Sequence, residues 1–126
     1  MSAPLAIGGD GTRAPWKERR WKSQRWAGGW YQGTWYQFSA YGSFKYNGSQ
    51  LISGYLRCSE WSSVGFTVSS QGCYREAQKK GSMDSVDRRG LHVLGTSFPA
   101  TFNRWTRTRT WVSGSIQRWN DRGYVG

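Results

Sequence analysis

The chain has 126 residues, with 18 Lys and Arg against seven Asp and Glu and a formal net charge of +11. This length fits one domain that buries about two-thirds of its unfolded surface without metals, and the charge favours a polyanion or an anionic surface as partner. No stretch approaches the roughly twenty apolar residues of a membrane helix, and the N-terminus lacks a cationic start followed by an apolar core, so neither a transmembrane segment nor an uncleaved signal peptide is predicted.

Aromatic rings supply the apolar area that aliphatic residues usually provide. The chain has nine Trp, seven Tyr and five Phe, and its 17 Gly with only three Pro favour short strands and tight turns. We therefore predict an all-β fold, a small antiparallel β-sandwich or barrel of about eight short strands. The predicted division is an extended basic, Trp-rich arm over residues 1–28 and a single all-β domain over 29–126.

The predicted arm combines indoles with cations. Residues 1–15 are Gly-rich and lack apolar periodicity. From Trp16 the indoles recur in steps of five at Trp21 and Trp26, which spreads them around a helix by about 140° per step and puts the first two on opposite faces of a strand. A short helix over 16–26 and an extended arm laid over the body, with each Trp anchored separately, both stay open.

A β-hairpin is predicted at Asn47-Gly48, the pair that a type I′ turn requires. Without a bulge, this turn predicts that Tyr46 faces Ser49, Phe44 faces Leu51 and Phe38 faces Arg57. Further strands are expected at residues 54–61, 64–68 and 72–76, separated by polar turns. Residues 77–90 are so polar that we expect a long loop there, before strand character returns at 91–95 and 97–102.

Residues 105–112 give the clearest strand pattern of the chain, and a last strand follows Gly114. Alternation puts the Thr side chains on one face and four larger residues, Trp105, Arg107, Arg109 and Trp111, on the other. Such a face is typical of the cationic, aromatic platforms that bind single-stranded nucleic acid. The alternative is that the indoles belong to a core and the two Arg bond to carboxylates of a neighbouring strand.

The sequence gives only weak support for catalysis, limited to Glu60 and Glu76 as a possible pair of glycosidase carboxylates. His92 is the only histidine, and the seven carboxylates have no spacing typical of a metal site. The sequence also lacks a nucleophile elbow, a phosphate-binding loop and a dinucleotide-binding motif. We predict a protein that is not an enzyme and uses no cofactor and no metal.

Cys58 and Cys73 are candidates for one disulfide, because their spacing matches no zinc motif. Two buried thiols are the alternative. A disulfide would place the protein outside a reducing cytosol, so a virion or extracellular location is preferred to a cytoplasmic one.

These observations predict a non-enzymatic binding or structural protein that engages a polyanion, either nucleic acid in a viral or phage particle or an acidic envelope polymer, and that is compatible with self-assembly. The alternative function is that of a secreted, disulfide-containing bacterial β-sandwich that acts on a cell envelope as an antagonist or adhesin. The predicted polyanion-binding residues are Arg13, Trp16, Lys17, Arg19, Arg20, Trp21, Lys22, Arg25, Trp26, Trp105, Arg107, Arg109 and Trp111.

Overall fold

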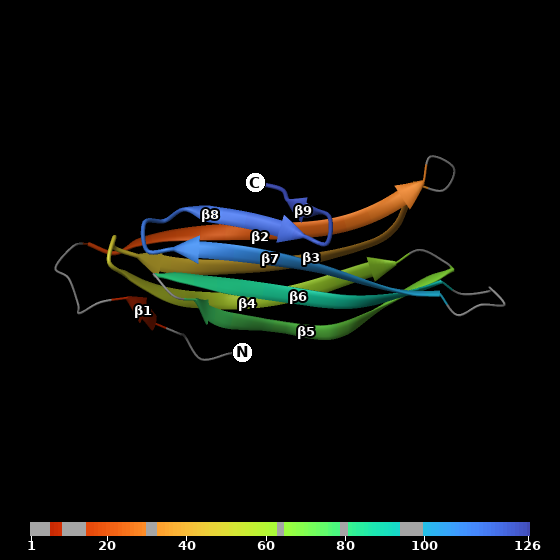
Figure 1. Ribbon diagram of the computed structural model, residues 1–126, viewed down its shortest axis with the longest axis horizontal. Coiled ribbons are helices and arrows are strands. Elements are labelled where there is room, and N and C mark those ends of the chain that lie inside the picture. The colour runs from red at the N-terminus through yellow and green to blue at the C-terminus, as the bar shows by residue number, and fades with distance from the viewer. Residues whose placement is uncertain (1–5, 9–14, 30–32, 63–64, 79–80, 94–99) are drawn as a thin grey trace.

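The protein is an all-β sandwich of two antiparallel sheets, which confirms the predicted fold class (Figure 1). The computed structural model describes residues 6–8, 15–29, 33–62, 65–78, 81–93 and 100–126. Sheet A has the order β1 (Ala6–Gly8), β4 (Gln50–Ser62), β3 (Gly33–Tyr46) and β2 (Lys17–Gly29). Sheet B has the order β5 (Phe66–Gln78), β6 (Ser82–Val93), β7 (Ala100–Trp111), β8 (Ile116–Asn120) and β9 (Gly123–Tyr124). None of the described segments is a helix long and apolar enough to cross a membrane.

Much of the expected arm is a strand of sheet A. We expected residues 1–28 to lie outside the domain, but β2 pairs with β3 from its first residue to its last, and the short β1 pairs with β4. Trp21, Ser23 and Arg25 are buried at alternate positions of β2, as expected for a strand with one face against a core. Residues 17–29 therefore belong to the sandwich, and no helix forms over them.

The β3–β4 hairpin lies where Asn47-Gly48 predicted it, but the predicted register is wrong. Tyr46 pairs with Leu51, and after a bulge at Gly42/Phe44 Phe38 pairs with Glu60. The turn is longer because the Asn47 side-chain oxygen accepts hydrogen bonds from two backbone N–H groups, those of Ser49 (3.1 Å) and Gln50 (2.8 Å).

Two further expectations for residues 64–90 are corrected by the structure. Residues 66–78 form one strand, β5, with a bulge between Ser70 and Gly72, rather than two strands. The expected polar loop over 77–90 contains the end of β5 and most of β6. Strand β6 tolerates its charges because Asp84, Asp87 and Arg89 are buried in ion pairs.

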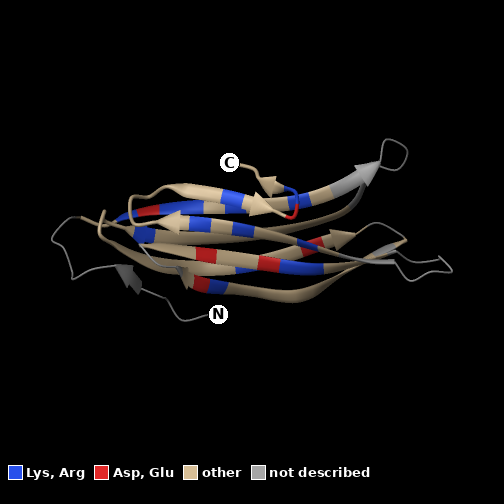
Figure 2. Ribbon diagram, viewed as in Figure 1, with Lys and Arg blue, Asp and Glu red and all other residues tan. Residues whose placement is uncertain are grey.

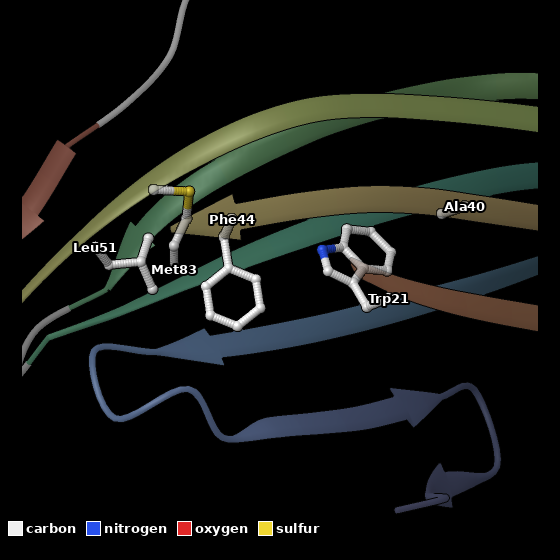
Figure 3. Close-up of a cluster of buried hydrophobic side chains, with 5 residues drawn as sticks. All are labelled: Trp21, Ala40, Phe44, Leu51 and Met83. Atoms are coloured by element: carbon white, nitrogen blue, oxygen red, sulfur yellow. The ribbon is translucent and has the colours of Figure 1, made fainter. Parts of the chain in front are cut away.

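The space between the sheets holds two apolar clusters. The larger contains Trp21, Ala40, Phe44, Leu51 and Met83 (Figure 3), and the smaller contains Tyr36, Phe38 and Leu91. The indole of Trp21 lies so close to the backbone of β3 that a β-carbon at position 42 would overlap it. Only glycine therefore fits at position 42.

Polar side chains also lie in the interior. The hydroxyls of Ser23 in β2 and Thr108 in β7 share a hydrogen bond, and Arg89 donates to Asp87 at 2.8 Å. Burial raises the pKa of Asp87 even though Arg89 opposes this effect.

A cysteine pair connects the two sheets. Cys58 in β4 and Cys73 in β5 have their sulfur atoms at bonding distance, 2.01 Å. The predicted disulfide partners are therefore placed to form the bond.

Candidate polyanion-binding face

The face of residues 105–111 was one of the two binding regions predicted from the sequence, and its predicted alternation is confirmed. The hydroxyl-bearing side chains of Thr106, Thr108 and Thr110 are buried between the sheets. The four residues on the opposite face of β7, Trp105, Arg107, Arg109 and Trp111, are each partly exposed.

The two Arg on this face already have carboxylate partners. Arg109 donates from Nε and Nη2 to the two oxygens of Asp84 at 2.7 and 3.0 Å. Arg107 donates to Glu76 at 3.0 Å and also bonds to Asp84, whose side chain is fully buried beneath them. The hydrogen bond to Asp84 raises the pKa of Arg109. The alternative that we stated for these Arg residues thus describes their contacts.

The aromatic groups beside this network are also engaged. The Arg109 guanidinium lies 4.9 Å from the ring centroid of Trp119, which in turn packs against Tyr124. The indole N–H of Trp111 donates to Gln117 at 2.8 Å. Few donors on this part of sheet B are free for an anion.

Three predicted residues of β2 project inward or bond to the opposite sheet. Trp21 is in the core, and Arg19 donates to the backbone oxygen of Gly114 at 2.7 Å. Arg25 is buried and forms two hydrogen bonds with Asp121, at 2.9 and 3.1 Å. Hydrogen bonding to Asp121 raises the pKa of Arg25. The predicted residue Arg13 lies outside the described residues.

The other predicted residues of β2 and its N-terminal flank are exposed, namely Trp16, Lys17, Arg20, Lys22 and Trp26. Arg20, Lys22 and Trp26 alternate with the buried positions, so they project from the outer face of sheet A. Trp16 and Lys17 lie at the start of β2, beside the β3–β4 turn.

The register of sheet A extends this outer face across three strands. Lys22 in β2 pairs with Tyr41 in β3, which pairs with Arg57 in β4. In a second row, Gln37 lies between Trp26 and Trp61. We call this face the platform, and we define it by Arg20, Lys22, Trp26, Tyr41, Tyr55, Arg57 and Trp61.

The platform cations contact rings instead of carboxylates. The Lys22 ammonium lies 5.3 Å from the ring centroid of Tyr41, and the Arg57 guanidinium lies 5.7 Å from that of Tyr55. Next to these contacts is a depression of about 590 Å³, lined by Arg20, Tyr41, Tyr55, Arg57, Cys58 and Ser59. The depression is open to solvent and presents both charge and π-faces.

The acidic residues lie mostly elsewhere. Figure 2 shows basic residues along β2 and acidic residues on β5 and β6. Within the described part of this face, Glu18 is the only carboxylate, and it pairs across the strands with Lys45. No ion pair among the described residues involves Arg20, Lys22 or Arg57.

Sequence reasoning missed the platform's contributions from β3 and β4. Tyr55, Arg57 and Trp61 occupy alternate positions of the predicted strand 54–61, so the strand period alone could have grouped them. Tyr41 could not be added in this way, because its place depends on the register of two neighbouring strands.

The described residues contain no cluster of three or more His, Cys, Asp or Glu that could hold a metal ion. A comparison of the whole chain with known protein families, curated proteins and solved structures finds no match.

Proposed function

We propose that this protein is a non-enzymatic binding or structural protein that engages a polyanion through the platform. One observation carries the proposal: Arg20, Lys22 and Arg57 lie among aromatic rings on one sheet face and have no described carboxylate partner. A cation without an ion pair can neutralise a phosphate, sulfate or carboxylate of the ligand and release its counterions. The sheet holds these cations in fixed register, which lowers the entropy cost of binding.

The proposal is tested with two double variants of equal charge. Lys22→Gln/Arg57→Gln removes two platform cations, and Arg88→Gln/Arg122→Gln removes two exposed cations, one from β6 and one from the β8–β9 turn. Binding is measured over a range of salt concentrations with a fluorescent single-stranded oligonucleotide and with heparin. For the oligonucleotide, we expect the platform variant to reduce the slope of log K against log salt by about 1.4, at about 0.7 per lost contact.

The matched control should change this slope much less. Equal losses in both variants would show that binding depends on net charge alone. An absence of binding to both probes at about 50 mM salt, where electrostatic association is strong, would overturn the proposal.

The cysteine pair supports a location outside a reducing cytosol, such as a virion or the extracellular space. It favours equally the second candidate, a secreted β-sandwich that acts on an acidic polymer of a bacterial envelope. The intact mass of the native protein, measured with and without reductant, tests this location. A mass that does not change on reduction would show that the cysteines are not bonded and would count against both a virion and an extracellular location.

A further inference from the structure

The platform exposes two large indoles in one row. Trp26 is 59% exposed and Trp61 is 53% exposed, and both flank Gln37. Side chains of this size are usually placed at interfaces when they are not in a core. Their position on the same face as the unpaired cations indicates that the ligand offers flat apolar groups as well as negative charges.

The spacing of these residues restricts the ligand further. Trp26 and Trp61 are two strands apart, about 10 Å between backbones, and the same holds for Lys22 and Arg57. The cation row is four residues along β2 from the indole row, about 13 Å. A chain that repeats negative charges and flat apolar groups on this scale fits these spacings.

We infer that the platform binds single-stranded nucleic acid, with bases stacked on Trp26 and Trp61 and phosphates held by Lys22 and Arg57. This inference rests on the proposed function. An unpaired strand presents both an anionic backbone and free base faces, and each base stacked on an aromatic side chain contributes substantially to affinity.

Other polyanions fit the platform less well. A duplex offers phosphates, but its base faces are stacked within the helix and cannot reach rings on a flat sheet. An acidic polysaccharide offers charge without an aromatic face. We therefore expect loss of the cations to weaken binding of the single strand, the duplex and the polysaccharide. Loss of the indoles should strongly weaken binding of the single strand only.

The row between the indoles and the cations predicts little sequence preference. It contains Gln24, Ser39 and Ser59, which pair across the three strands; Gln24 and Ser59 are exposed, and Ser39 is buried. The Gln24 amide and the Ser59 hydroxyl both donate and accept hydrogen bonds, so they can satisfy the edges of different bases. Binding that tolerates many sequences is typical of surfaces that rely on stacking.

The test compares Trp26→Ala and Trp61→Ala with Tyr124→Ala, which removes a ring that is 60% exposed on sheet B. Affinities are measured for a mixed-sequence single strand, its duplex and heparin. We expect each Trp variant to weaken single-strand binding by about 5- to 150-fold with an unchanged salt slope, because stacking releases no counterions. The Tyr124 variant should stay within about twofold of the unmodified protein for every probe, since its ring lies off the platform.

Trp26→Phe and Trp61→Phe provide a second measurement that does not depend on whether the fold accepts Ala at these two positions. A ring of any kind should restore part of the affinity for the single strand. Partial rescue by Phe supports stacking, and equal losses in Phe and Ala variants would contradict it.

The outcomes separate this inference from the proposed function. If the Lys22 and Arg57 variants weaken binding while the Trp variants do not, the polyanion proposal stands and the single-strand inference fails. Equal affinity for the duplex, or heparin binding with the same Trp dependence, would also overturn the inference. Absence of binding of the unmodified protein to every probe at about 50 mM salt would overturn both.

Discussion

The two outer faces of the sandwich carry similar side chains in different electrostatic states. On sheet B, Arg107 and Arg109 share a face with two indoles, but their guanidinium groups form ion pairs with Asp84 and Glu76. On sheet A, Lys22 and Arg57 lie beside Tyr rings with no carboxylate partner in the described residues. A cationic, aromatic strand pattern is therefore not enough to define a binding face.

The difference arises from the neighbouring strands. Asp84 on β6 pairs directly with Arg109 on β7, and Glu76 on β5 pairs with Asp84. Arg25 gives a third example, because Asp121 beyond the end of β8 holds it between the sheets. In each case the partner of the Arg is a carboxylate of sheet B or of its β8–β9 turn, and for Arg107 and Arg109 this pairing limits what a ligand on the outer face can bind.

The largest effect is expected for Asp121→Asn, which tests how much a carboxylate partner stabilises the inward-facing Arg25. The Arg25 side chain is only 6% exposed, so loss of its partner leaves a nearly buried charge uncompensated. We expect the free energy of unfolding at neutral pH to fall by about 3 kcal/mol, measured by chemical denaturation. An unchanged value would show that the ion pair contributes nothing to folding.

The same variant should change the pH dependence of stability. Burial alone would raise the pKa of Asp121, but its hydrogen bond and charge interaction with Arg25 outweigh burial and lower that pKa below 3.8. A carboxylate with a lowered folded pKa contributes stability that is complete above its unfolded pKa and is lost as the pH falls through the folded value. Denaturation between about pH 3 and 7 should therefore show a flatter acid limb for the variant than for the unmodified protein.

Asp84→Asn should convert the closed face into an open one. It weakens the charged hydrogen bonds of Arg107 and Arg109, so we expect a loss of about 2 kcal/mol in stability. The released cations should also raise affinity for a single-stranded oligonucleotide and increase the salt slope by about 0.7 to 1.4.

Glu76→Gln is the control for this change, because it alters the net charge equally and leaves Arg107 bonded to Asp84. We expect a smaller gain in affinity from it. Equal gains in the two variants would mean that net charge, rather than the release of particular Arg side chains, controls binding.

Local patterns predicted the parts of the fold that depend on neighbouring residues in sequence. The alternation of residues 105–111 and the hairpin at Asn47-Gly48 follow from strand period and turn chemistry. The Cys58 and Cys73 pair was also identified correctly as able to form a disulfide.

Pairing between distant residues could not be predicted in this way. β6 looked like a loop because several of its charges find partners in other strands, such as Arg109, which is 25 residues from Asp84. The five-residue Trp steps obscured β2, in which Trp21 faces the core and Trp26 faces outward. The platform itself needs the register of three strands, which a bulge at Gly42/Phe44 shifts.

Gly48→Val should have the smallest effect, and it sharpens the comparison because it touches neither outer face. Gly48 has φ of +95°, where a branched side chain is strained, although no atom lies within 4 Å of its β-carbon position. We expect a loss of about 1 to 2 kcal/mol, with little change in affinity for any probe. Gly48→Asn is the matched control, since Asn tolerates this backbone region better, and thermal melting should rank the proteins as Gly, then Asn, then Val. If the Val variant melts at the same temperature as the unmodified protein, the turn relaxes to accept the side chain. The backbone N–H of Gly48 donates to the Val112 oxygen at 2.9 Å, which ties the turn to sheet B. A loss of affinity for the same oligonucleotide at the same salt concentration would show that the turn helps to position the platform.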